Sequence, residues 1–379
     1  MADWTSTAKR LSVGAGAAAL GAVLLHRLRK YLYDDRERAD ELHHVQTDDG
    51  IQLGIWRHRP RIGEPGEPIL LVHGFGLNHR HYDLNENYSL ASFLANRGYD
   101  CWLVDLRGRG ASQIPDDPWC FDDYIQHDIP AVIDYILKRT GMEELHWAGH
   151  SMGAMIYHAY AGTSGDQDRI ASAVVTQGPF HGRTPRRRRG DSEDGNSPEL
   201  VAFNNFFIPM IELFRRLRIP WTGVVRFGAF WMPQLRKIVP DQLIHILFNP
   251  DNITHENLKQ ASVRIVERVG PQVLAQFMDW GVNRRWTNRE GDLNYRKGIQ
   301  SITVPTRIVA GEIDKLCPPH NQRAGFEEIG SDSKDFITAG KENGFSADYS
   351  HLDFVHGEKA PEEIYPLFSK WFEKYTIKR

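Results

Sequence analysis

Short runs of apolar residues recur along the first half of this chain, and segments with helical periodicity separate them. The runs are ILLVH, DCWLV, LHWAGH and ASAVVTQ, at residues 69–73, 100–104, 145–150 and 171–177. Strands that are apolar along their whole length are typical of a parallel sheet that helices cover on both faces. Two further runs follow at 306–311 and 334–340. The pattern predicts an α/β protein with a mostly parallel central sheet.

A hairpin and several helices are expected around these runs. Residues 41–59 predict two strands joined at Asp49-Gly50, a dipeptide that favours tight hairpin turns. Helices are predicted at 88–98, at 123–141, where Gly141 marks the end, and at 361–375.

The alternation stops in the middle of the chain, which indicates an insertion. A charged stretch rich in Pro, Gly and Ser, expected to be a solvated loop, is followed by a helical region heavy in Phe and Trp. The sequence predicts an N-terminal apolar anchor or tail at 1–35 and the first part of the core at 36–180. A helical cap insertion with its charged loop is predicted at 181–300, and the second part of the core at 301–379.

Residues 11–25, LSVGAGAAALGAVLL, form an uncharged and mostly apolar run between basic residues. As a helix the run would be about 22 Å long, which is shorter than the ~30 Å hydrocarbon core of a bilayer. We therefore predict a short membrane anchor or interfacial helix, with the main domain on the cytoplasmic side because basic residues are slightly more numerous after the run. The alternative is a surface helix or disordered tail on a soluble cytoplasmic protein.

The overall composition excludes some classes of function. A formal net charge of −3 gives no reason to expect a nucleic-acid partner. Three scattered cysteines are too few for a disulfide framework or a metal site.

The run at 145–150 ends in Gly149-His150-Ser151-Met152-Gly153 and continues as a helical pattern. A G-x-S-x-G sequence between a strand and a helix is the pattern of a nucleophile elbow, in which only small residues fit two positions before and after the serine. The motif alone occurs often by chance, so its place between a strand and a helix carries the argument. A tight turn with an idle serine is the alternative.

A serine hydroxyl needs a neighbouring base, which in such sites is a histidine oriented by a carboxylate. In elbow proteins the acid follows the serine and the histidine comes last. Asp314, in the loop after the fifth apolar run, and His351, between the last strand and the last helix, fit that order. Glu312 and His356 are rivals for these roles, and Asp353 is expected to form local hydrogen bonds. Among the other histidines, His73, His150 and His158 precede the acid, which is the wrong order for the base.

A reaction through an oxyanion needs hydrogen-bond donors that hold the negative charge. His73-Gly74 ends the first apolar run, and the glycine lets the backbone turn so that the next amide faces the site. The expected donors are the backbone N–H groups of Phe75 and of Met152. His73 is expected to shape this turn. A plain glycine turn is the alternative.

Five segments together resemble an α/β-hydrolase: HGFG, DLRGRGAS, GHSMG, GEIDKLCPP and HLDF. The resemblance covers residues 42–180 and 300–379. Within that superfamily, LNENYSLASFLANRGYDCWLVDLRGRGAS and YSHLDFVHG are similar to segments of the acid lipases of the gastric and lysosomal type. The resemblance implies an α/β-hydrolase fold and hydrolysis of carboxylic esters, with Ser151, Asp314 and His351 as the catalytic triad.

These observations predict a serine hydrolase that cleaves small-molecule esters through an acyl-enzyme and needs no metal or organic cofactor. The aromatic content of the insertion suggests an apolar pocket, and hence an apolar or lipid-like substrate; the alternative is that these residues form the core of the cap itself. An acyltransferase or thioesterase of the same fold is an alternative, as is a non-catalytic binding protein. A serine at the elbow argues against dehalogenase and epoxide-hydrolase chemistry, which uses a carboxylate there.

Overall fold

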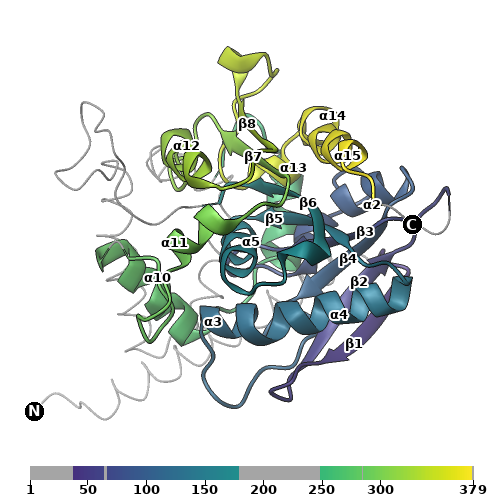
Figure 1. The fold of residues 1–379 in the computed structure, drawn as a ribbon. Coiled ribbons are helices and arrows are strands. Elements are labelled where there is room, and N and C mark those ends of the chain that lie inside the picture. Colours follow the sequence, from purple (N-terminus) through teal and green to yellow (C-terminus); the bar gives the residue numbers. More distant parts are fainter. Residues whose placement is uncertain (1–36, 64–65, 179–247, 284, 378–379) are drawn as a thin grey trace, which may run out of the picture.

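The structure is a computed structural model, and it describes residues 37–63, 66–178, 248–283 and 285–377. Within these ranges, eight strands form one sheet in the order β1-β2-β4-β3-β5-β6-β7-β8 (Figure 1). The strands are β1 Glu41–Gln46, β2 Gln52–His58, β3 Pro68–Val72, β4 Asp100–Asp105, β5 Leu145–His150, β6 Ile170–Thr176, β7 Thr306–Gly311 and β8 Lys334–Ala339. The β1–β2 and β2–β4 pairs are antiparallel and the other five are parallel. The predicted mostly parallel sheet is confirmed.

Helices cover both faces of this sheet (Figure 1). The α-helices of the described residues are α2 Leu90–Ala95, α3 Phe121–Asp123, α4 Ile129–Thr140, α5 Met152–Thr163, α9 His255–Arg264, α10 Pro271–Asn283, α11 Tyr295–Gly298, α12 Pro319–Glu328, α13 Asp353–His356, α14 Ala360–Glu363 and α15 Tyr365–Lys374. Apolar side chains of α4, α5 and α10 belong to the core on one face, and those of α2, α14 and α15 belong to the core on the other.

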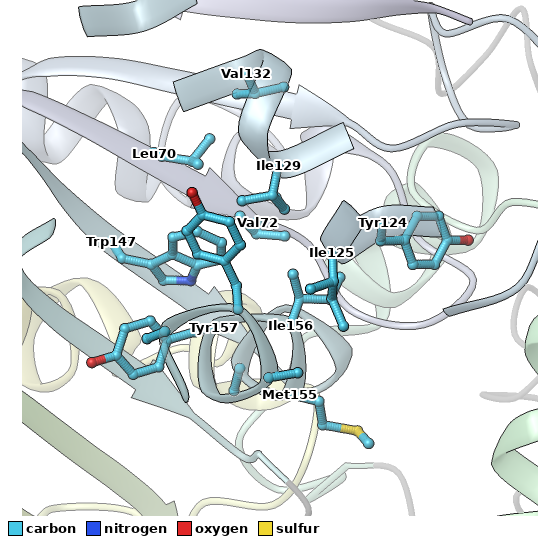
Figure 2. Packing of buried hydrophobic residues seen from close by; sticks show 14 of the residues in the cluster. Leu70, Val72, Tyr124, Ile125, Ile129, Val132, Trp147, Met155, Ile156 and Tyr157 are labelled. Atoms are coloured by element: carbon cyan, nitrogen blue, oxygen red, sulfur yellow. The ribbon is translucent and has the colours of Figure 1, made fainter. Parts of the chain in front are cut away.

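Strand β3 shows why the apolar runs are continuous. Its side chains alternate between the two cores: Leu70 and Val72 pack on the α4 and α5 side, whereas Ile69 and Leu71 pack on the α2 and α15 side. Figure 2 shows Leu70 and Val72 close to apolar side chains of α4 and α5. Because both faces are buried, every position of the strand has to be apolar.

Two predicted helices are divided in the structure, and proline explains both divisions. The segment predicted at 123–141 contains a π-helical turn, Tyr124–Asp128, before α4. Pro130 has no backbone N–H, so the regular hydrogen-bond pattern cannot continue through it. The segment predicted at 361–375 is divided into α14 and α15 at Ile364, with Pro366 in the first turn of α15. The apolar periodicity predicted one continuous helix in each case, because this pattern does not reveal where a backbone N–H donor is missing.

The predicted insertion at 181–300 is described only in part, because residues 179–247 lie outside the described ranges. Helices α9 and α10 come from its described portion. Helix α11 packs against α5 so closely that a Cβ on Gly298 would lie 2.8 Å from the carbonyl oxygen of Gly162. The predicted anchor at 11–25 also lies outside the described residues. In the described ranges, no helix combines the length and apolar character needed to cross a bilayer.

Candidate active site

Ser151 lies at the turn between β5 and α5 with backbone angles φ 54° and ψ −114°. A positive φ is uncommon for a residue with a Cβ and costs free energy. Hydrogen bonds on both sides hold this conformation: the Ser151 amide donates to the carbonyl of Thr176 at 2.9 Å, and the Ser151 carbonyl accepts from the amide of Ala154 at 3.0 Å. The turn therefore places the hydroxyl at the carboxyl end of the parallel strands.

Crowding explains both glycines of the motif. A Cβ on Gly149 would lie 2.7 Å from the carbonyl oxygen of Gly153, and a Cβ on Gly153 would lie 2.0 Å from the carbonyl oxygen of Val72. Both contacts are with backbone atoms, which cannot rotate away as a side chain can. The helix that follows the serine thus crosses β3 at a distance that only glycine permits.

This crowding gives a testable prediction for Gly153→Ala. We expect the variant to lose at least about 3 kcal/mol of stability, because the new methyl group must displace β3 or α5. Gly281→Ala is the matched control, since Gly281 is in α10 and a Cβ added there would meet no neighbouring element within 4 Å; a helical Gly-to-Ala change should be neutral or stabilise by about 0.5–1 kcal/mol. Thermal unfolding of both variants measures the contrast, and equal melting temperatures would contradict the crowding argument.

The structure brings the three predicted polar residues into one hydrogen-bonded series. The Ser151 hydroxyl lies 2.9 Å from His351 Nε2, and His351 Nδ1 lies 2.9 Å from Asp314 Oδ2. Asp314 is 2% exposed and His351 is 5% exposed. With a proton on Nδ1 the ring donates to the carboxylate, and Nε2 is then free to accept the serine proton.

Backbone amides fix the Asp314 carboxylate. Its Oδ1 accepts from the amides of Leu316 at 2.8 Å and of Cys317 at 2.9 Å, which leaves Oδ2 to face the imidazole. The loop after β7 therefore orients the acid without using another side chain.

The rival residues are engaged elsewhere. Glu312 accepts from the side-chain amide of Asn343 at 2.8 Å. Asp353 accepts from the backbone amide of Ser350, which fits its predicted local role, and burial raises its pKa to about 6. His356 donates from Nε2 to the carbonyl of His81 at 2.8 Å. Each is held in a contact away from the serine hydroxyl.

Two further buried histidines support the site as neutral rings. His150 donates from Nε2 to the carbonyl of His351 at 2.9 Å, and burial holds the pKa of His150 well below its usual range. His73 donates from Nδ1 to the carbonyl of Gly74 at 2.9 Å and accepts from the amide of Leu106 at 3.3 Å, while burial lowers its pKa to about 4. The His150 contact was not predicted, because it joins residues about 200 positions apart.

The two predicted oxyanion donors, the amides of Phe75 and Met152, have no hydrogen-bond acceptor among the described residues. Met152 is the first residue of α5, where an amide has no partner inside the helix and where the helix dipole favours negative charge. A Cβ on Gly74 would lie 3.2 Å from the Cβ of Ser151, so the Gly74 turn is close to the elbow.

The end of α9 and the segment directly after it hold the Phe75 turn in place. The Glu267 amide donates to the carbonyl of Gly76 at 2.7 Å, and the Asn78 side chain donates to the carbonyl of Arg264 at 2.9 Å. The Phe75 ring contacts that of Phe277 of α10 at 4.9 Å between centroids. This link was not predicted, because nothing in the local sequence indicates which part of the insertion reaches the turn.

Aromatic rings continue from Phe75 into α10. Phe277 lies 5.1 Å from Trp280 and 5.9 Å from Phe121, measured between ring centroids. Phe75 and Phe277 are only partly buried, whereas Phe121 and Trp280 are buried. The turn that carries one predicted oxyanion donor is thus lined by an apolar surface.

Two groups of side chains in the described ranges could approach a single metal ion: Asp314 with Cys317 and His351, and Asp48 with Asp49 and His127. The first group includes the hydrogen-bonded acid and imidazole, and burial raises the pKa of the Cys317 thiol well above its usual range. In the second group Asp49 is paired with Arg107 at 2.7 Å. The carboxylates and imidazoles of both groups already have protein partners.

Comparison with known proteins assigns this chain to a family. A family model described as the alpha/beta hydrolase fold matches residues 67–197. Gastric triacylglycerol lipase from Rattus norvegicus is 35% identical over 360 residues, covering 85% of this chain and 85% of that lipase. The chain belongs to the α/β-hydrolase family. The predicted resemblance to the acid lipases is thereby confirmed.

Further relatives of this α/β-hydrolase agree with the assignment. Lipase 1 from Drosophila melanogaster is 26% identical over 361 residues, covering 86% of this chain and 74% of that protein. A solved esterase from Thermogutta terrifontis, at 19% identity, has the same fold with a TM-score of 0.55 over 89% of this chain and all of the esterase. The solved esterase shows the fold alone, and it is the lipase relatives that make the α/β-hydrolase described here a carboxylic ester hydrolase.

Proposed function

We propose that this α/β-hydrolase cleaves esters through an acyl-enzyme on Ser151, with His351 as the general base and Asp314 as the residue that orients the imidazole. The observation that carries the proposal is the hydrogen-bonded series from Ser151 through His351 to Asp314, with 2.9 Å at each contact. A buried carboxylate, an imidazole and a hydroxyl in this order are the arrangement that activates a serine.

In the first half of the reaction, the Ser151 oxygen attacks the carbonyl carbon while its proton passes to His351 Nε2. The carbonyl oxygen becomes an oxyanion that accepts hydrogen bonds from the amides of Phe75 and Met152. When the tetrahedral intermediate collapses, the imidazolium gives its proton to the leaving alcohol, and the acyl group stays on Ser151.

In the second half, His351 removes a proton from water, and the resulting hydroxide attacks the acyl-enzyme. The intermediate collapses to release the carboxylic acid, and the serine recovers its proton from the imidazolium. The Asp314 carboxylate accepts from His351 Nδ1 throughout, and so it stabilises the positive charge on the ring.

The substrate proposed for this site is an ester with an apolar, lipid-like acyl chain. The support is the partly exposed pair Phe75 and Phe277, which lies directly beside the predicted oxyanion turn. The relatives support the same class, since one of them is named for triacylglycerol. A panel of p-nitrophenyl esters from acetate to palmitate tests the proposal. A steady rise of kcat/KM from acetate to octanoate is expected, and a strict preference for acetate would contradict it.

Phe277→Ala should change this chain-length preference. Removing the ring removes apolar surface beside the acyl chain, and about 1.4 kcal/mol of lost contact corresponds to a tenfold loss. We expect kcat/KM for the octanoate ester to fall by about tenfold, with little change for the acetate ester. Phe326→Ala is the matched control, because Phe326 is also partly buried and paired with an aromatic ring, that of Phe336 at 5.4 Å. An equal loss for both esters would mean that Phe277 does not contact the acyl chain.

A further inference from the structure

Gln177, the residue directly after β6, has an unusual backbone conformation. Its φ is 54°, and within the described ranges only one other non-glycine residue has a positive φ, which is Ser151. Gln177 is also fully buried. Strain of this kind persists only where surrounding contacts enforce it, and it concentrates at functional sites.

The Gln177 side chain joins three separate parts of the chain. Its Oε1 accepts from the amide of Gly311 at 3.1 Å and from the side-chain amide of Gln322, in α12, at 3.1 Å. Its Nε2 donates to the carbonyl of Ser350 at 2.9 Å. Both acceptor positions of Oε1 and one N–H of Nε2 are therefore directed at groups on other elements.

Two of these contacts lie next to the catalytic pair. Gly311 ends β7, three residues before Asp314, and Ser350 immediately precedes His351. The contact region is tightly packed, because a Cβ on Gly311 would lie 2.5 Å from Gln177 Nε2 and 2.4 Å from the carbonyl oxygen of Tyr349. The loops that carry the acid and the imidazole therefore meet at the Gln177 amide, aided by a backbone bond from Ile313 to Tyr349 at 3.2 Å.

We infer that Gln177 is a positioning residue, which sets the Asp314–His351 contact by holding the two loops that carry them. The inference rests on the proposed function of that pair. Gln177 touches no reacting atom, and it acts through the Gly311 amide and the Ser350 carbonyl. A primary amide suits this place because it offers an acceptor to the former and a donor to the latter. An apolar side chain would leave these buried groups unpaired.

Gln177→Glu provides a sharp test, because only the protonated acid can imitate the amide. Neutral Glu accepts from Gly311 and donates its O–H to Ser350, whereas the ionised form turns an acceptor toward the Ser350 carbonyl. Burial raises the pKa of such a carboxyl. We expect kcat near the wild-type value at the acidic end of the measurable range. As the carboxyl ionises, kcat should fall by at least tenfold with an unchanged KM.

Gln177→Gly is the matched variant, because glycine accepts the positive φ without strain but supplies no hydrogen bonds. We expect it to lower kcat by at least tenfold at every pH, with KM within twofold of wild type. The titratable groups near the contact, namely Asp314, His351, Cys317 and the Asp353 carboxyl that accepts from the Ser350 amide, are the same in both variants. A pH-dependent fall in kcat that occurs only in Gln177→Glu therefore reports the introduced carboxyl. Activity is expressed per site titrated by a fluorophosphonate, which removes the effect of unfolded protein.

Two results would overturn the inference: a wild-type kcat per titrated site in Gln177→Gly, or a pH profile of Gln177→Glu that is parallel to that of wild type. If either result is obtained while the wild-type enzyme is labelled at Ser151, only the inference about Gln177 is rejected and the proposed function stands. Failure of the wild-type enzyme to be labelled at Ser151 would instead reject the proposed function. The two failures are therefore distinguishable in one series.

Discussion

Ser151→Ala should lower kcat for ester hydrolysis by about 10⁵-fold or more, because the alanine variant has no oxygen to form the acyl bond. The fold should survive, since the strained turn is held by the backbone hydrogen bonds that Ser151 donates to Thr176 and accepts from Ala154, rather than by the hydroxyl. Any residual rate above that of uncatalysed ester hydrolysis in water would reflect the oxyanion donors and substrate binding alone.

Ser164→Ala is the control for this experiment. Ser164 lies at the opposite end of α5, and its hydroxyl accepts from the exposed amide of Asp166. We expect wild-type activity from it. The measurement is the initial rate with p-nitrophenyl butyrate, together with the melting temperature of each variant. Retention of more than about 1% of the wild-type kcat by folded Ser151→Ala would remove Ser151 from the mechanism.

Asp314→Asn should lower kcat by about 10⁴-fold with little change in KM. The amides of Leu316 and Cys317 both donate to Oδ1, so the oxygen of the introduced amide has to occupy that position. Its NH₂ group then faces His351 Nδ1. A donor at that place forces the imidazole proton onto Nε2, where the ring can no longer accept the proton of Ser151.

Glu312→Gln is the matched control, because Glu312 is the rival acid two residues away and its carboxylate contacts Asn343. We expect a change in kcat of less than about threefold for it, the range of a surface substitution. If Glu312→Gln were as damaging as Asp314→Asn, the identity of the acid would have to be reassigned.

The strands and the elbow could be predicted because their physical signals are local. Continuous apolar runs reflect burial on both faces of the sheet, and β3 shows this directly, with alternate side chains in the two cores. The glycines of the elbow are dictated by contacts that any strand-to-helix turn of this kind creates, such as that of Gly153 with Val72. The chain order of serine, acid and histidine further limits which acid and which histidine can belong to the site, and this order can be read directly from the sequence.

The supporting contacts could not be predicted, because they depend on which distant segments meet. His150 donates to the carbonyl of His351, and Gln177 joins Gly311 to Ser350. In the sequence, these residues look like an ordinary turn histidine and an ordinary strand-end glutamine. The link from Glu267 to Gly76 depends in the same way on how the predicted insertion meets the core. Local pattern therefore indicates the residues proposed to react, and it does not indicate the residues that contact them from distant segments.

The central claim is that the Ser151 oxygen is the nucleophile and that His351 activates it. Peptide mass spectrometry of the wild-type protein after treatment with a fluorophosphonate tests that claim most directly. We predict one phosphonylated residue, Ser151, with a labelling rate that falls by at least about 10³-fold in folded His351→Ala. An active enzyme whose adduct lies on another residue, or whose Ser151 is labelled equally fast without His351, would contradict it.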